Sequence, residues 1–423
     1  MVDVPDPGWI EARLVAARPR AVAALLRYFR DLDLAEEAFQ EACLRALSKW
    51  PVQGPPRDTV AWLIMVGRNL TLDHVRRQSR LTELEGEGEV AAGEDVEDDL
   101  AERLDESHYR DDILRLLFTC CHPDLPATQQ VALALRVVSG LSVAQIARAF
   151  LIGERAMEQR ITRAKARIAQ TGIAFEAPGP VERAQRLAAV STMIYLVFNE
   201  GYSDSSPESE RASLCDEGIR LARLLLRLFP SEPEIMGLLA LMLLSHSRKR
   251  ARFDSDGSLI LLEKQDRSLW DQTLIREALA MIDKAMLHRR PGPYQIQAAI
   301  AALHARAERA SDTDWGGIDQ LYAALQRHDP SPVVTLNRAV AVSKIRGAQD
   351  ALDMVEPLAE PLSGYFYFHG LCGALLQQLG RKHEARQAFN RAIGLAATAA
   401  EAAHIREHLD QLETGLRQGS GGP

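Results

Sequence analysis

The sequence predicts an all-α protein, with two small helical domains joined by an acidic linker and followed by a larger domain of helical repeats. Outside the loops, nearly every segment places apolar residues at positions i, i+3, i+4 and i+7, which is the spacing of one face of a helix. Alanine, leucine, arginine and glutamate dominate these segments, and all four favour helix. The sequence lacks convincing runs of alternating β-branched residues, the usual sign of strands.

Breaks in composition divide the chain into blocks. Between the first two helical blocks lies a segment rich in glycine and acid, which predicts a flexible linker. The second block ends at the strong breakers Pro178, Gly179 and Pro180. The predicted domains are residues 1–80, the linker 81–106, residues 107–177 and the helical extension 178–415, with a disordered tail at 416–423.

The charge and the cysteines indicate the compartment. The formal net charge is −8, yet from Glu83 to Glu106 about a dozen carboxylates accompany a single basic residue, Arg103, so the rest of the chain is mildly basic. The cysteines are scattered and five in number, which fits a reducing cytosol. The longest apolar run is shorter than the roughly 18 residues of a membrane span. We expect a cytoplasmic protein with no membrane segment.

The clearest chemistry lies between Ser139 and Gln170. Ser142 can cap a short helix, Gly153 allows a tight turn, and a second helix then begins, which is the spacing of a helix-turn-helix. The second helix joins an apolar stripe to a basic face, as expected of a helix that enters the major groove of DNA. An ordinary helical hairpin with a solvated basic face is the alternative. The candidate DNA-binding residues are Arg155, Glu158, Gln159, Arg160, Thr162, Arg163, Lys165 and Arg167.

The strings "GLSVAQIARAF" and "AMEQRITRAKARI" in this segment resemble region 4 of bacterial σ factors of the extracytoplasmic-function class. The resemblance implies that the second helix binds the −35 element of a promoter. Glu158 departs from the family pattern, which commonly has a basic or small polar residue there. The −35 sequence therefore does not follow from the resemblance.

A second resemblance lies in the first block, where "LAEEAFQEACLRAL" is similar to region 2.2 of the same family, with Cys43 in place of the usual phenylalanine. In the family this helix docks on the clamp helices of the polymerase β′ subunit, and an acidic face suits a basic partner. On its own the string would indicate only a solvated acidic face. The implied polymerase-binding residues are Glu36, Glu37, Gln40 and Glu41.

The segment from Pro56 to Arg80 is similar to regions 2.3 and 2.4, which bind the −10 element in the family. The preceding loop, "WPVQGPPRD", contains three prolines and a glycine and is expected to form a rigid turn. In the family that loop captures a flipped base of the melted strand. Trp62 is expected in the core, because its spacing matches an apolar stripe. The implied −10 residues are Arg57, Asp58, Asn69, Asp73, Arg76, Arg77 and Arg80.

The string "FTCCHPDLPA" raises the question of a metal or redox site. Its adjacent cysteines lack the spacing of zinc ligands, which usually come as two separated pairs. We therefore interpret Cys120 and Cys121 as small apolar residues near a helix end, with His122 close to its cap. Thiol redox sensing stays open, because reactivity requires an exposed, electropositive thiol. The chain is expected to bind neither a metal nor a cofactor.

The extension is unusual, because most σ factors of this class end soon after region 4. Its segment from His369 to Ala396 looks like a tetratricopeptide repeat, with Gly380 at the turn between helices. Stacked repeats of this kind present a concave surface. The extension resembles that of the tetratricopeptide-bearing subgroup of σ factors. Its other pattern positions are Gly373, Ala385, Phe389 and Ala392.

Together these patterns predict a σ factor rather than an enzyme, since no catalytic constellation stands out. The implied partners are core RNA polymerase, through its β′ clamp helices and β flap, and promoter DNA. The extension is expected to regulate the factor in cis, by masking DNA-binding surfaces or by contacting polymerase, and it could bind an unknown protein or small-molecule ligand. The rival hypotheses are a one-component regulator that acts without polymerase, and an enzyme with its site in the extension.

Overall fold

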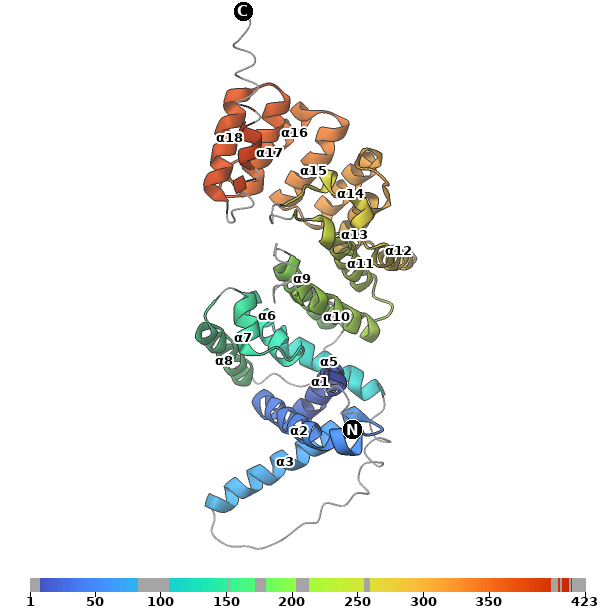
Figure 1. Ribbon diagram of the computed structural model, residues 1–423, viewed down its shortest axis with the longest axis vertical. Helices are drawn as coiled ribbons and strands as arrows, with labels where there is room; N and C mark the ends of the chain where they lie inside the picture. The colour runs from blue at the N-terminus through green and yellow to red at the C-terminus, as the bar shows by residue number, and fades with distance from the viewer. Residues whose placement is uncertain are drawn as a thin grey trace, which may run out of the picture. The chain divides into compact units, whose positions relative to one another are not determined.

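The computed structural model is helical throughout the part of the chain that it describes (Figure 1). Besides the helices, the described residues contain one isolated β-bridge, between Phe253 and Leu259. The all-α prediction is therefore confirmed. The chain divides into two compact units, Met1–Gly201 and Tyr202–Pro423. The described residues are 8–82, 106–150, 152–171, 180–202, 213–254, 259–396, 402–403, 405–410 and 412.

Two of the predicted segments fall largely or wholly outside the described residues. The predicted acidic linker is one of them, because α3 ends at Thr82 and α5 begins at Glu106. The predicted tail at 416–423 is the other. The predicted start of the extension, residue 178, precedes α9, and the contacts place almost all of α9 in the first unit.

The first unit opens with three helices whose ends follow from local chemistry. The side chain of Asp31 accepts a hydrogen bond from the backbone N–H of Leu34 at 3.0 Å and so caps α2. Gly54, with φ of 79°, ends α2 in a conformation that glycine adopts without strain. The predicted loop is therefore shorter than its proline content indicated, since α2 includes Pro51. The helices are α1 (Gly8–Phe29), α2 (Leu32–Gln53) and α3 (Thr59–Thr82).

Trp50 closes the core at one end of these helices. It is 2% exposed and packs with Ile10 and Ala46. Trp9 stacks on it with ring centroids 6.4 Å apart, and Trp62 lies at 5.3 Å. Trp62 is half-buried against this cluster, which confirms its predicted place in the core.

Helix α1 also connects the two predicted σ blocks. Every residue from Ala21 to Leu26 is buried, and a helix that is apolar all round must be covered on more than one side. It packs against α2 and α3 on the one hand and against α5 on the other. The ion pair between Arg27 and the buried Asp112 of α5, at 3.2 Å, adds to this contact. The later helices are α5 (Glu106–Cys120), α6 (Ala127–Val137), α7 (Val143–Ala149), α8 (Glu154–Thr171) and α9 (Pro180–Tyr202).

The second unit is a series of helical hairpins, in which α11 packs on α12, α13 on α14, α15 on α16 and α17 on α18. Helix α17 begins 34 residues after α15, which is the period of a tetratricopeptide repeat. Short 3-10 helices are η1 (Lys249–Ala251), η2 (Leu262–Lys264), η3 (Arg267–Leu269), η4 (Ala310–Asp312) and η5 (Glu356–Leu358). The α-helices are α10 (Ser213–Leu228), α11 (Pro233–Ser247), α12 (Gln272–Met286), α13 (Pro293–Arg306), α14 (Trp315–His328), α15 (Pro332–Ile345), α16 (Ala348–Val355), α17 (Phe366–Gln378) and α18 (Lys382–Leu395).

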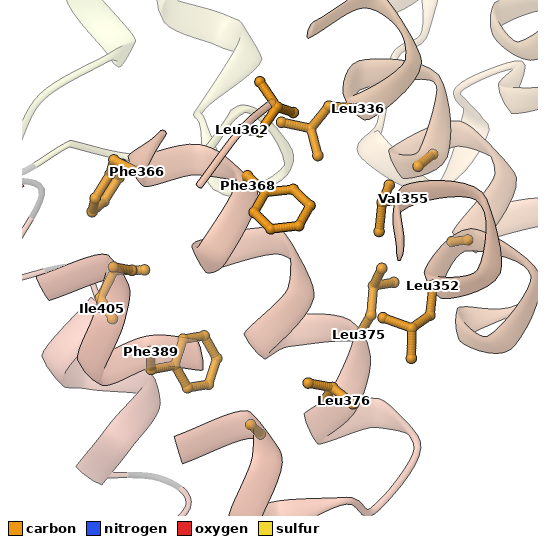
Figure 2. Close-up of a cluster of buried hydrophobic side chains, with 14 of the residues drawn as sticks. Leu336, Leu352, Val355, Leu362, Phe366, Phe368, Leu375, Leu376, Phe389 and Ile405 are labelled. Atoms are coloured by element: carbon orange, nitrogen blue, oxygen red, sulfur yellow. The ribbon is translucent and has the colours of Figure 1, made fainter. Parts of the chain in front are cut away.

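The last hairpin has the residue positions that the sequence predicts for a repeat. A Cβ atom at Gly373 would lie 2.5 Å from the ring of Phe389, so only glycine lets the two helices approach this closely. Gly380, with φ of 73°, occupies the turn. Figure 2 shows Phe389 within the apolar cluster of the last four helices, together with Phe368 and Leu375. The buried side chains that complete the pattern are Ala385 and Ala392, both 0% exposed.

Candidate nucleic-acid interface

The helix-turn-helix has the caps and turn that its sequence predicts. Ser142 Oγ accepts from the N–H of Gln145 at 3.1 Å, while the Gln145 side chain accepts from the N–H of Ser142 at 2.8 Å. This reciprocal pair is a capping box at the start of α7. Ile146 and Ala147 are buried, and Gly153 precedes α8. The structure thus confirms the predicted cap at Ser142 and buries the apolar side of α7.

Helix α8 buries one face and leaves most of its polar residues in solvent. Met157, Ile161 and Ala164 are 0%, 5% and 0% exposed, so they anchor the helix to the first unit. Of the predicted −35 residues, Arg160 and Lys165 are half-buried. The others are exposed: Arg155, Glu158, Gln159, Thr162, Arg163 and Arg167.

The predicted polymerase-binding face of α2 is only partly open. Glu37 and Gln40 are exposed and Glu41 is half-buried. Glu36 is 4% exposed, which is unusual for a carboxylate and requires charged or hydrogen-bonding partners. The sequence indicates the polar face but not the burial of this one member.

Three cations surround the carboxylate of Glu36. Lys165 Nζ lies 2.6 Å from one carboxylate oxygen, and Arg18 lies 3.1 Å from the other. Arg136 approaches that second oxygen at 3.7 Å. Because these cations come from α8, α1 and α6, a single buried carboxylate links the region 2 helices to the helix-turn-helix. We call Arg18, Asp33, Glu36, Arg136 and Lys165 the ionic joint.

Arg18 holds the joint to the end of α6. Its guanidinium donates to the carbonyl of Val137 at 3.0 Å and to that of Arg136 at 3.1 Å. A cation is favourable there, because the last carbonyls of a helix lack partners within the helix. Gly140, with φ of 77°, makes room, since a Cβ atom would lie 2.8 Å from Arg18 Cδ. Arg18 also lies over the ring of Phe39, 5.0 Å from its centroid.

Lys165 is the member of the joint that the sequence assigns to DNA. Besides Glu36, it contacts Asp33 Oδ1 at 2.5 Å. Burial acts to lower the pKa of Lys165, but the charges and hydrogen bonds of Glu36 and Asp33 outweigh it, and the pKa is raised. The amine is therefore charged and bonded to α2 in this structure. The sequence gives no local signal for Arg18, Asp33 or Arg136 as partners, because each contact joins distant segments.

The predicted −10 residues lie around the start of α3 and along it. Arg57, Asp58 and Asn69 are exposed. Asp58 accepts from the backbone N–H groups of Val60 and Ala61 at 2.9 and 3.0 Å, so its carboxylate stabilises the start of α3. The remaining predicted residues belong to α3, but their side chains lie outside the described part: Asp73, Arg76, Arg77 and Arg80.

The cysteine pair lies in the core. Cys120 and Cys121 are 0% and 1% exposed. Burial raises the pKa of the Cys120 thiol well above its usual range and that of Cys121 to about 12. A thiol of this kind is a poor nucleophile at neutral pH, which favours the packing interpretation over redox sensing. His122 follows the end of α5, and its ring accepts from the N–H of Asp124 at 3.3 Å.

The described residues contain no group of three or more histidine, cysteine, aspartate or glutamate side chains arranged to hold a metal ion. Within the same residues, no helix is long and apolar enough to cross a membrane.

Comparison with known families matches three stretches of the chain. Residues 14–81 match sigma-70 region 2, and residues 115–168 match sigma-70 region 4. Residues 186–286 match a family of unknown function, DUF6596. The two sigma-70 matches contain every predicted polymerase- and promoter-binding residue.

The chain is also similar to individual proteins. The chain is 70% identical over 408 residues to an uncharacterized protein, R00370, of Rhizobium meliloti, covering 96% of each. It is 34% identical over 140 residues to the ECF RNA polymerase sigma factor BldN of Streptomyces coelicolor, covering 32% of this chain and 49% of BldN. Yeast Tom70 aligns over 96% of this chain and 85% of its own at 12% identity, but its TM-score of 0.38 does not establish a shared fold.

Proposed function

Since the chain belongs to the extracytoplasmic-function class of RNA polymerase σ factors, we propose that the exposed part of α2 docks on core polymerase while α3 and α8 bind the −10 and −35 promoter elements. One observation carries the proposal. Region 2 and region 4 occur in the family order, and the region 4 match folds into a capped helix-turn-helix with an exposed basic helix.

The polymerase contact rests on charge. Glu37 and Gln40 are exposed on α2, and Glu41 is half-buried beside them. An acidic, hydrogen-bonding face of this kind suits a basic partner helix, and the clamp helices of the β′ subunit are that partner in our proposal. The β flap is proposed as the second polymerase contact, made by the region 4 helices.

The −35 contact rests on α8. Arg155, Arg163 and Arg167 are exposed and can bind phosphates or donate two hydrogen bonds to a guanine. Gln159 can pair with adenine, and Glu158 can accept from the amino group of cytosine. Because both residues are exposed on the same helix as the arginines, base reading and phosphate binding can occur together.

The −10 contact rests on the loop before α3 and on α3 itself. Arg57 is exposed beside the capped start of the helix, and Asn69 is exposed further along. A melted strand offers unpaired bases to such a surface and phosphates to the arginines that follow on α3. The Asp58 carboxylate, which is already bonded to the backbone, would shape the loop rather than read a base.

The ionic joint gives this σ factor a closed state. Lys165 cannot contact a phosphate while it is bonded to Asp33 and Glu36, and Glu36 cannot contact polymerase while it is buried. A polymerase contact made by Glu36 and a DNA contact made by Lys165 would therefore each compete with the joint. In our proposal the closed state is the free form of the factor, and it opens on polymerase.

The extension regulates this cycle in cis in our proposal, from the cytoplasm where polymerase acts. Its hairpins form a separate compact unit of the kind that binds partners on a continuous surface. It would act either by masking the DNA-binding surfaces or by contacting polymerase. The one-component regulator, the rival hypothesis, leaves the region 2 match without a purpose.

The test is a binding assay with purified core polymerase, which separates the two hypotheses. The full-length chain is expected to bind core, and the double variant Glu37→Ala, Glu41→Ala is expected to bind at least tenfold more weakly. Glu11→Ala, an exposed acidic change on α1, serves as the control and should bind as the wild type does. If the full-length chain binds duplex DNA but not core, the σ-factor proposal is wrong and the one-component regulator is favoured.

A further inference from the structure

The second unit contains a cavity that the σ-factor surfaces do not use. Its volume is about 410 Å³, and its walls come from α11, α13, α14 and α15 together with η2. This volume lies within the range of small-molecule sites in proteins. The cavity thus has the size and the walls of a ligand site.

The lining divides into an apolar wall and a set of polar groups. Leu241, Ile300 and Leu325 supply aliphatic surface from three different helices. Gln297, Ser245, Asn337 and His304 supply hydrogen-bonding groups. Apolar and polar groups face this cavity in similar measure, so its lining suits a ligand that is apolar in one part and polar in another, and the polar groups would fix the orientation of that ligand.

Arg248 provides the charge. Its guanidinium donates to the Tyr202 hydroxyl at 3.0 Å and lies over the ring of Trp270, 5.9 Å from the centroid. Arg267 lies over the same ring at 4.7 Å and donates to the carbonyl of Ala307 at 2.8 Å. A cation fixed in this way loses little freedom when it binds an anion, which favours affinity.

The charges around the cavity are positive on balance near Arg248 and Arg267. Asp329 also lines the cavity, but it is exposed. Glu263 is bonded to Lys344 at 2.9 Å, so its charge is already compensated. Burial, followed by the charges of Arg248 and Arg267, lowers the pKa of His304 to about 4. The histidine is therefore neutral at physiological pH and can both donate and accept a hydrogen bond.

We propose that this cavity binds a small amphipathic organic anion, whose acidic group pairs with Arg248 and whose apolar body packs against Leu241, Ile300 and Leu325. The hydrogen-bonding groups of the lining then select among anions of the same size. The lining residues all belong to the second unit.

A second cavity nearby offers a matched control. It measures about 280 Å³ and is bordered by Gln295, Arg289 and Arg290 at the start of α13. The Gln295 side-chain amide already donates to Glu234 at 3.0 Å and to the Arg290 carbonyl at 2.8 Å. Both of its N–H groups therefore have partners within the protein, and neither is left for a polar ligand. Ala301 lines the larger cavity and Ala299 the smaller one, both half-buried on the same helix.

The experiment titrates the full-length protein with 8-anilinonaphthalene-1-sulfonate, an amphipathic anion, and follows its fluorescence. Ala301→Phe fills the larger cavity and is expected to weaken binding at least tenfold, while Ala299→Phe leaves it unchanged. Arg248→Met is expected to weaken binding about tenfold or more, because a charge-assisted hydrogen bond is lost. Octanesulfonate should displace the probe at least tenfold better than octanol does.

Several outcomes overturn the proposal. These are an absence of probe binding by the wild type, equal binding by the wild type and Ala301→Phe, or a loss that follows Ala299→Phe instead. Equal binding by Arg248→Met overturns the pairing of the anion with Arg248. Circular dichroism checks that each variant folds. If Ala301→Phe does not fold, Asn337→Trp narrows the same cavity from an exposed position on α15 and is expected to weaken binding as well.

Discussion

Lys165 in the helix-turn-helix donates to the buried carboxylate of Glu36 in α2 across 2.6 Å, although 129 residues separate the two. The first residue is assigned to promoter DNA by its sequence and the second to polymerase. Their contact joins the surfaces that we propose for promoter DNA and for polymerase, because neither residue can bind an external partner until the pair separates.

Substitution of Glu36 tests how much the ionic joint stabilises the first unit. Glu36→Gln leaves Arg18, which is 8% exposed, without a counter-charge, and removing one partner of a buried pair costs about 3–5 kcal/mol. Urea unfolding of the full-length protein measures this cost. Glu37→Gln, an exposed change on the same helix, is expected to stay within about 0.5 kcal/mol of the wild type. Equal stability of the two variants would contradict a stabilising joint.

Chemical labelling of lysines reports whether the joint is closed. Amine reagents attack the neutral form, so the raised pKa and partial burial of Lys165 predict slower labelling than at the exposed Lys49. Asp33→Asn removes one partner and is expected to speed the labelling of Lys165 several-fold, and core polymerase should do the same if it opens the joint. Mass spectrometry measures both rates, and Lys49 is the internal control.

The same pKa gives the pH dependence of the joint. A lysine whose pKa is raised on folding contributes stability that is fully present below its unfolded value and is lost as pH rises through the folded value. The joint should therefore persist through neutral pH and weaken only in alkali. A rise in Lys165 labelling near neutral pH that exceeds the rise at Lys49 would contradict this.

Arg163 tests the −35 contact. It is exposed on α8, and if it binds a phosphate, Arg163→Ala should weaken promoter binding by the factor–polymerase complex and reduce the salt slope by about one. Arg13→Ala, an exposed change on α1, is the control for lost charge. A salt slope that is unchanged in Arg163→Ala would exclude this residue from the phosphate contacts.

The lowered pKa of His304 predicts that the second unit loses stability in acid. Its pKa of about 4 lies below the ordinary value of 6.5, so the unfolded chain takes up the proton first as pH falls. Stability should therefore decline by up to about 3 kcal/mol between pH 6.5 and 4. Thermal unfolding of His304→Gln should lack that part of the decline, whereas the exposed His328→Gln should retain it. Parallel curves for the wild type and His304→Gln would contradict the burial argument.

Local patterns predicted much of this structure. The cap at Ser142, the turn at Gly153 and the contact of Gly373 with Phe389 each depend on residues close together in the sequence, where spacing determines geometry. The apolar run from Ala21 to Leu26 likewise indicates a helix that is covered on several sides.

Contacts between distant segments could not be predicted in this way. A polar helix face looks the same whether its carboxylate is solvated or buried, so the sequence of α2 does not distinguish Glu36 from Glu37. Arg18 lies within the region 2 match but before the string that begins at Leu34, and its role depends on the end of α6, more than 100 residues away. The boundary between the units also differs from the Pro178–Pro180 break, because α9 continues to Tyr202.

The most direct test of the account is run-off transcription with purified core polymerase on DNA from the region upstream of the gene for this protein. The full-length protein is expected to start transcription where core alone does not, and a chain that ends at residue 202 should start it at a different level. Equal levels would contradict regulation by the extension. Failure of both forms to start transcription, with duplex binding retained, would contradict the assignment as a σ factor.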